Sequence, residues 1–398
     1  MASPPRPHPL ARAKPAIWAD RAVQALWDGG VTAKPPLEPE FLWSIGSRGF
    51  DSEDEHAGRS EAEVEDFRTR LDRLCPSLRG EAKLSALGHT MAYGQLTSAI
   101  RKRHALGRIW RESPELATTE IAPPILIVGQ MRTGTTRIHR LIAADPRHTG
   151  TRFCNSHYPV PAKPDLRPLK AGAALAIARR INPWLDTLHP FGATRIDEEI
   201  GWLAAALSPA TFEAQWHIPE FVRWSEARDP GPVYAEFARI LRTDAATMGD
   251  EALPRAIKCP QFSEDLPALL AQFPEARVVV THRDSQAVLD SSVSLIASQM
   301  AFQSGQADLA TIQAEWGRKL ALREKRIEQA LSEFEGHVAR VEFDALGADW
   351  RREIIRIYAA LEIEQLPAAL AEIEREYERS NTGAHREHRS QIARFAEA

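Results

Sequence analysis

The chain has 398 residues, of which 43% are hydrophobic and 26% charged, a balance typical of a folded globular protein. Its formal net charge of -4 gives no electrostatic basis for nucleic-acid binding, so an anionic ligand requires a local arrangement of cations. No segment approaches the roughly 20 apolar residues that span a bilayer, and the N-terminal segment lacks the apolar stretch of a signal peptide. The cysteines, Cys75, Cys154 and Cys259, are far apart, which favours reduced thiols in a cytoplasmic protein.

Residues 1–118 are predicted to form a mostly helical N-terminal region. Residues 1–50 are rich in proline and tryptophan, which indicates an irregular wrap with one or two short helices. The acidic run 51–65 has little to bury and predicts a solvated loop and a helix start. Beyond it, apolar residues recur at helical spacings up to about Arg111, with an interruption expected at Pro76.

The pattern changes at Ile121, where short apolar, β-branched runs predict the buried strands of a sheet. These runs are residues 125–128, 277–281 and 338–343, with a shorter one at 256–258. Helical stretches separate them, which indicates an α/β domain over 119–398 with a central parallel sheet flanked by helices. Residues at about 150–250 read as a mostly helical insertion within this domain.

A glycine-containing turn, residues 129–136, joins the first predicted strand to a predicted helix. Glycines permit a tight turn, and the first amides of a helix are unpaired donors at the positive end of its dipole. This P-loop-like arrangement suits phosphate, and the hydroxyls of Thr135 and Thr136 add donors. Thr135 stands where nucleoside triphosphatases carry a lysine, and Arg132 supplies positive charge instead.

A second candidate anion site follows the strand at 277–281. Arg283 lies just past the strand end, and Ser291 lies eight residues later on the following predicted helix. A guanidinium fork and a hydroxyl placed in this way can converge on one phosphate. An ion pair between Arg283 and a carboxylate such as Asp284 is the alternative explanation.

The loop, together with Pro123 and Asp145-Pro146, resembles the nucleotide-binding loop of bacterial sulfotransferases, which use 3′-phosphoadenosine 5′-phosphosulfate (PAPS). Arg283 and Ser291 resemble that family's 3′-phosphate site, with Ser285 where the family has a proline. The resemblance implies PAPS as co-substrate, PAP as product and no metal. The nucleotide contacts that it implies are Arg132, Thr133, Gly134, Thr135, Thr136, Arg283 and Ser291.

Residues 257–260 resemble the family's lysine-x-proline segment, which implies that Lys258 reaches the sulfonate-bearing end of PAPS. Sulfonate transfer, like phosphoryl transfer, depends on in-line positioning and charge stabilisation. Arg132 and Lys258 would neutralise the charge that builds on the leaving nucleotide. A general base would take the proton of the acceptor hydroxyl or amine.

The base stays open between Glu198 and Glu199. The family resemblance favours Glu198, whereas an apolar stripe that starts at Ile196 on a predicted helix places Glu199 beside the buried face. A solvated charge cluster is the alternative for both.

Two histidines are weaker candidates for the base. Asn155 stands where many relatives have a glutamate, and His157 lies nearby. His189 is a further option.

The acceptor is expected to be a small molecule, apolar or aromatic in character, but the aromatic residues of this segment fit a helix-packing core equally well. They are Trp184, Phe191, Trp202, Phe212, Trp216, Phe221 and Trp224. Near the C-terminus, the basic cluster 384–389 stands where relatives close over the nucleotide, although a solvated tail is the default.

The sequence therefore predicts sulfonate transfer from PAPS to a hydroxyl or amine of an unidentified acceptor. One alternative is a P-loop kinase or nucleotide hydrolase. The other is a nucleotide-binding homologue that has lost its base, as Asn155 suggests, together with Gln261 and Phe262 where the family carries a histidine.

Overall fold

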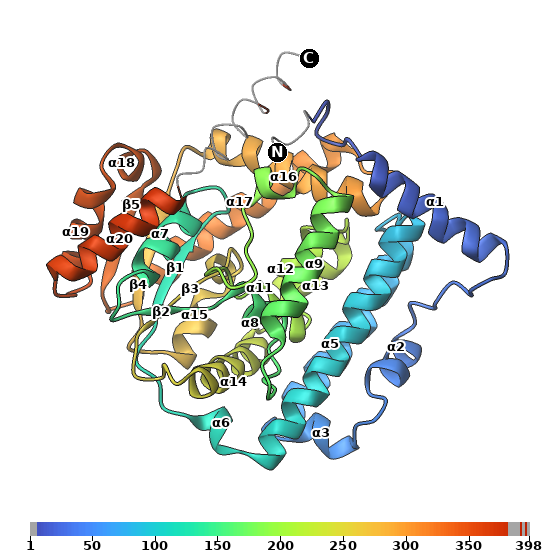
Figure 1. The fold of residues 1–398 in the computed structure, drawn as a ribbon, viewed down its shortest axis with the longest axis horizontal. Helices are drawn as coiled ribbons and strands as arrows, with labels where there is room; N and C mark the ends of the chain where they lie inside the picture. Colours follow the sequence, from blue (N-terminus) through green and yellow to red (C-terminus); the bar gives the residue numbers. More distant parts are fainter. Residues whose placement is uncertain (1–5, 381–390, 392–394, 396–398) are drawn as a thin grey trace.

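The computed structural model describes residues 6–380 together with Gln391 and Phe395. In Figure 1 the strands and the C-terminal helices lie on one side of the molecule and the N-terminal helices on the other. The N-terminal helices are α1 (Lys14–Asp28), α2 (Pro39–Gly46), α3 (Ser52–His56), α4 (Glu61–Gly80), α5 (Ala86–Glu112) and α6 (Glu115–Thr118).

The strands form one parallel sheet in the order β2-β3-β1-β4-β5. They are β1 (Ile125–Gly129), β2 (Thr149–Gly150), β3 (Arg255–Lys258), β4 (Arg277–His282) and β5 (Val338–Glu342). The chain leaves central β1 for β2 and β3 on one side and then crosses to β4 and β5 on the other. Such a reversal leaves a crevice at the carboxyl ends of the strands, where α/β proteins bind ligands.

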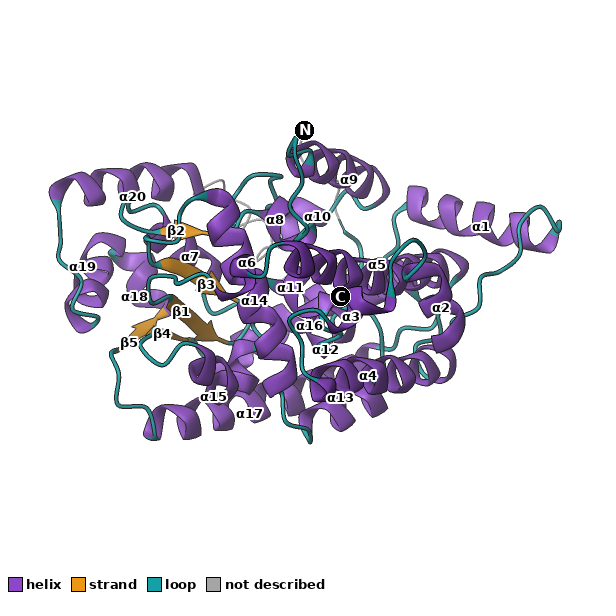
Figure 2. Cartoon of the chain, turned by 90° about the horizontal axis from the view of Figure 1, so that it is seen from below, coloured by secondary structure: helices purple, strands orange, loops and turns teal. Residues whose placement is uncertain are grey.

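Helices cover both faces of this sheet, and Figure 2 shows α20 on one side of it and α15 and α17 on the other. Between β1 and β3 lie α7 (Thr135–Ala143), α8 (Phe153–His157), α9 (Arg167–Ile181), α10 (Leu185–Leu188), α11 (Ile200–Ala205), α12 (Pro209–Glu213), α13 (Pro219–Glu226) and α14 (Gly231–Met248). The later helices are α15 (Phe262–Gln272), α16 (Ser285–Gln303), α17 (Leu309–Ser332), α18 (Phe343–Ala348), α19 (Trp350–Ala360) and α20 (Pro367–Ser380).

The predicted fold class is confirmed, and each of the four predicted strands is present. Strand β2 was not predicted, because its two residues are too few to produce a pattern. The interruption at Pro76 is wrong, since α4 continues to Gly80. Its face with Leu71, Leu74 and Leu78 is buried, and this packing offsets the hydrogen bond that proline cannot donate.

The acidic run 51–65 is not a solvated loop, since α3 and the start of α4 occupy most of it. The carboxylate of Asp54 has no exposed surface and lies 2.8 Å from Arg108 Nη2 and 3.0 Å from Arg111 Nη2. Two arginines of α5 therefore hold this part of the chain inside the fold.

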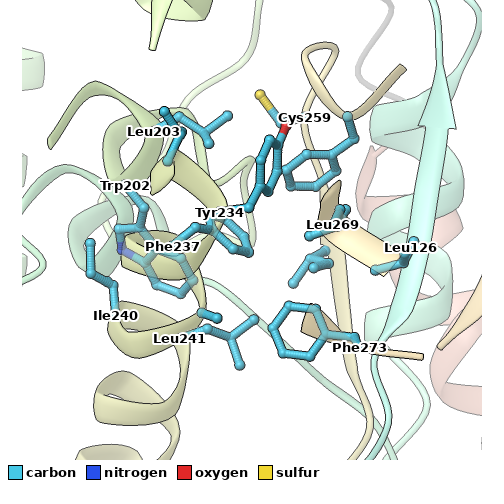
Figure 3. Close-up of a cluster of buried hydrophobic side chains, with 14 of the residues drawn as sticks. Leu126, Trp202, Leu203, Tyr234, Phe237, Ile240, Leu241, Cys259, Leu269 and Phe273 are labelled. Carbon is cyan, nitrogen blue, oxygen red and sulfur yellow. The ribbon is translucent and has the colours of Figure 1, made fainter. Parts of the chain in front are cut away.

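The hydrophobic core joins the N-terminal helices to the rest of the chain. Figure 3 shows Leu126 of β1 and Trp202 on opposite sides of one buried cluster, with Tyr234 and Phe237 between them. Trp110 of α5 belongs to the same cluster. A second cluster combines α4 and α5 with α12 and α13. The division at residue 118 stays a prediction.

None of the helices in the described part of the chain combines the length and apolar composition needed to cross a membrane. The three cysteines are buried free thiols. The basic cluster 384–389, with Arg386 and Arg389, lies outside the described residues.

Candidate active site

The turn between β1 and α7 lies at the carboxyl edge of the sheet, where the strand order reverses. Gly134 caps α7 with a φ of +91°, and Arg132 adopts a φ of +70° although it carries a side chain. A non-glycine residue in this region is strained, and such strain is concentrated at functional sites. At the start of the turn, a Cβ on Gly129 would lie 2.3 Å from Thr281 Oγ1, so glycine is required there.

The hydrogen-bonding groups of the turn have two different roles: some bond within the loop, and others have no acceptor in the described protein. Thr133 Oγ1 donates to the carbonyl of Gln130 at 2.6 Å and contacts Thr281 Oγ1 at 2.6 Å, so this hydroxyl shapes the loop. Within the described residues, the amides of Gly134, Thr135 and Thr136 find no acceptor in the protein. These donors stand at the positive end of α7 and are available to a phosphate.

The two predicted anion sites brace each other. Arg132 Nε donates to Ser291 Oγ at 2.8 Å, and Arg283 Nη1 donates to the Arg132 carbonyl at 2.8 Å. The Arg283 guanidinium also lies 4.3 Å from the ring centroid of Phe343. The structure therefore brings residues 129–136 and 283–291 into one arrangement.

Positive charge is concentrated between these sites. Burial and the neighbouring Arg283 charge lower the pKa of Arg132 to about 10. Arg132 forms no ion pair with a carboxylate in the part of the chain that the structure describes. Two neighbouring guanidiniums repel each other, and a bound anion relieves that repulsion.

A solvent-open cavity of about 220 Å³ borders the turn between α16 and α17. Gln130, Thr133 and Arg283 are among the residues that line it. The loop is therefore reachable from solvent on this side.

Lys258 is the last residue of β3, beside β1. It contacts two carboxylates of the segment before α11. Its Nζ lies 2.7 Å from Glu198 Oε2, and its backbone N–H donates to Glu199 Oε2 at 2.8 Å. The Glu198 side chain keeps 19% of its surface exposed, whereas Glu199 keeps none. Of the two carboxylates, only Glu198 offers an accessible oxygen.

Residues 194–199 do not form the predicted helix, since α11 begins only at Ile200. Ile196 therefore does not belong to a helical apolar stripe, and the reason for placing Glu199 beside the buried face was wrong. Glu199 is nevertheless buried, as predicted. Burial raises the pKa of Glu199 to about 8, which keeps this carboxyl mainly protonated at neutral pH.

Beside this pair lies a buried Asp197 that sequence reasoning did not single out. Its carboxylate accepts from His189 Nε2 at 3.1 Å and lies 3.6 Å from Arg140 Nη2. Burial opposes ionisation of Asp197, but the charges of His189 and Arg140 dominate and lower its pKa. These contacts orient His189 close to Glu198.

His189, Asp197 and Glu198 lie close enough together to resemble a metal-ligand set. However, Arg140 and Lys258 already neutralise the two carboxylates. Two cationic side chains beside the group disfavour the binding of a metal cation. That the protein requires no metal stays our prediction.

Residues 155–157 connect α8 to this site. Asn155 is buried and its Nδ2 donates to Asp244 Oδ1 at 2.6 Å, so its side chain is committed to the core. Ser156 Oγ donates to the Glu198 carbonyl at 2.8 Å and accepts from the Gly201 amide at 3.1 Å. These two hydrogen bonds of Ser156 hold the end of α8, with His157, against the segment that contains Glu198. Burial and the Lys102 charge lower the pKa of His157 to about 4, so this imidazole is neutral.

Most aromatic residues proposed for the acceptor pocket belong to the core. Trp202, Phe212, Trp216 and Phe221 are fully buried, and Trp224 packs against the second cluster. Phe191 is the one that reaches the site, with its ring centroid 4.5 Å from that of His189. The spacing of aromatic residues in the sequence does not distinguish those that pack in the core from those that line the site.

A parallel sheet with a glycine-containing turn at its switch point and an arginine pair beside it places the protein in the α/β class and suits a ligand that carries phosphate. The Sulfotransferase family profile matches residues 123–367, more than half of the chain. The chain therefore belongs to the sulfotransferase family and is a sulfotransferase, and the family implies a small-molecule acceptor. The kinase alternative is thereby wrong.

Solved structures agree with this assignment. Sulfotransferase STF1 from Mycobacterium tuberculosis H37Rv is 25% identical, with a TM-score of 0.75 over 92% of this chain and 100% of its own. Sulfotransferase STF9 from Mycobacterium avium is 16% identical and shares the fold, with a TM-score of 0.76 over 90% of this chain and 95% of its own. A search of curated proteins finds no match.

Proposed function

We propose that this sulfotransferase uses PAPS and transfers its sulfonate to a hydroxyl or amine of a small molecule that is partly apolar or aromatic. The observation that carries the proposal is the mutual bracing of the loop and the Arg283–Ser291 pair. Two adjacent anion sites on one rigid edge suit a nucleotide with phosphates at both ends of its ribose. A donor with a single phosphate group would leave one site unused.

The backbone amides of Gly134, Thr135 and Thr136 are assigned to the 5′-phosphate, and Thr133 keeps the loop in shape. Arg283 and Ser291 are assigned to the 3′-phosphate. When bound, PAPS supplies a sulfonate already activated on a phosphate. Arg132 and Lys258 stand at the strand ends between donor and acceptor and stabilise charge on the transferring and leaving groups.

Glu198 is the base that the geometry favours. Its carboxylate is accessible, and its ion pair with Lys258 orients it. Glu199 is enclosed and protonated, and its oxygen accepts from the Lys258 backbone, which is a positioning role. Asn155 does not imply a lost base, since its side chain serves the Asp244 contact instead.

Two coarser expectations are proposed alongside. The free, buried thiols support a cytoplasmic location. The concentration of helices before β1 supports treating residues 1–118 as a helical region attached to a sulfotransferase domain over 119–398.

The function is tested by transfer of radiolabelled sulfonate from PAPS to a panel of phenols, alcohols, amines and sugars, together with thermal shift by PAP and by ATP. We expect stabilisation by PAP and transfer to at least one acceptor class. Stabilisation by ATP but not by PAP would contradict the donor. PAP binding without transfer to any class would favour an inactive homologue.

A further inference from the structure

Lys102 of α5 contributes an unusual charge to the acceptor side of the site. It is half-buried, and within the described residues it has no hydrogen bond and no carboxylate within 4.0 Å. Its nearest recorded partner is the Tyr158 ring, with the centroid 5.9 Å from Nζ. Burial lowers its pKa to about 8, which leaves the ammonium mostly protonated at neutral pH.

A half-buried ammonium without a protein acceptor costs stability, because burial removes part of its hydration without replacing it. The buried lysines of the described chain are both paired: Lys258 with Glu198, and Lys319 with Glu213, Glu226 and Glu264. Lys102 lacks this compensation. A perturbed, unpaired cation that lies beside an active site suggests a ligand that carries the missing anion.

The position of Lys102 relates it to the reacting groups. The charges of Lys102, Asp197 and Glu198 all act on the pKa of His157, so the four groups lie around one small region. Helix α5 contacts α11, which begins two residues after Glu198. The hydrogen bond from Ser156 to the Glu198 carbonyl holds α8 to the same segment. The N-terminal region therefore supplies a charged side chain to the acceptor side.

An aromatic path leads from this region toward the loop. The His157 and Phe153 ring centroids lie 4.3 Å apart, those of Phe153 and Phe191 lie 5.5 Å apart, and Phe191 contacts His189 at 4.5 Å. Arg132 Nη1 donates to the carbonyl of Leu188, immediately before His189, at 3.1 Å. The path thus runs from the Lys102 end to the proposed sulfonate position.

We propose that Lys102 is an acceptor-specificity residue that binds a carboxylate of the acceptor, whose apolar or aromatic body lies along the Phe153–Phe191 path. The inference rests on the proposed function and adds a substrate class: acceptors that combine a sulfonatable hydroxyl or amine with a carboxylate. Lys258 is not assigned to this carboxylate, because its ammonium pairs with Glu198 and is assigned to the transferring sulfonate.

The test uses matched acceptor pairs that differ only in carboxylate versus carboxamide, such as 4-hydroxyphenylacetate and 4-hydroxyphenylacetamide, with equivalent alcohol and amine pairs. The full chain should prefer the carboxylate. Lys102→Met should raise KM for the carboxylate on the order of 10- to 100-fold, the loss expected for a hydrogen bond to a charged group, with kcat, the KM for PAPS and turnover of the carboxamide little changed. Lys102→Arg should restore most of the preference.

Thermal unfolding separates this role from a structural one. Lys102→Met removes an uncompensated charge, so its Tm should equal or exceed that of the wild type. Equal losses with both acceptors, a raised KM for PAPS, or no preference in the wild type would each overturn the inference while leaving PAPS-dependent transfer intact. Absence of transfer from PAPS to any acceptor would instead overturn the proposed function.

Discussion

The proposed donor and acceptor sides of the site are built from the chain in different ways. The donor side comes from two short strand-to-helix turns, residues 129–136 and 283–291, in which each contact has a fixed sequence spacing. The acceptor side is assembled from α5, α8, the segment before α11 and the end of β3, which lie far apart in sequence. Motifs can therefore reveal the donor, whereas the acceptor groups become visible only when the fold brings them together.

The largest effect is expected from Arg132→Ala, because Arg132 is the residue proposed to lie between the donor side and the acceptor side. Turnover should fall by roughly 100- to 1,000-fold, the loss typical of removing one preorganised charge-stabilising donor. PAP affinity should fall far less, since the helix amides and Arg283 remain. Single-turnover kinetics and calorimetry with PAP measure the two effects separately.

Arg132→Lys is the matched control, because it keeps the charge but loses the fork that reaches Ser291 and Leu188. An intermediate rate is expected. Loss of PAP binding in Arg132→Ala with turnover retained would mean that the assigned roles of the two anion sites are exchanged.

Glu198→Gln should follow, with kcat reduced on the order of 100-fold and PAP affinity unchanged, because a general base contributes about that much or more. Glu199→Gln is the matched control at the adjacent position. It replaces a protonated carboxyl by an amide of the same shape, so kcat should change by less than about 3-fold. Equal rates in the two variants would remove Glu198 as the base, and a rate loss confined to Glu199→Gln would reverse the assignment.

A smaller but sharper effect is expected from Arg283→Ala. PAP affinity should fall roughly 10- to 100-fold, as expected for hydrogen bonds to a charged group. Because Arg283 also holds the Arg132 carbonyl, kcat at saturating PAPS should fall as well. A loss of PAP affinity with no change in kcat would show that the bracing has no catalytic role.

The last prediction concerns stability and not turnover, namely the pH dependence of the free energy of unfolding at Glu199. Burial raises its folded-state pKa from 4.5 to about 8, so the folded protein holds a proton that the unfolded chain releases. This residue therefore lowers the free energy of unfolding as pH rises through that window, by at most about 1.4 kcal/mol per pH unit. The Tm advantage of Glu199→Gln over wild type should grow from pH 5 to pH 8, and a constant difference would contradict the shift.

The sequence predicts features that lie within one short segment better than features that the fold builds from distant segments. Strand β1 is a continuous apolar run, and β3, β4 and β5 each contain short apolar or β-branched stretches, so pattern alone locates them. The helix through Pro76 could not be predicted, because tertiary packing overrides the local cost of proline.

On the acceptor side, the separation of Glu198 from Glu199 depends on where α11 begins, a boundary that apolar spacing does not define. Lys102 belongs to no motif and lies among ordinary helical charges in the sequence. Its significance comes from burial and from the lack of a carboxylate partner among the described residues, both of which require the assembled fold.

The central claim is that two braced anion sites hold the two phosphate groups of one nucleotide. Calorimetry that compares PAP with adenosine 5′-phosphate, which lacks the 3′-phosphate, tests it most directly. The account predicts that PAP binds at least about 10-fold more tightly, since the 3′-phosphate adds a charged contact to Arg283 and Ser291. Equal affinities for the two nucleotides would contradict it.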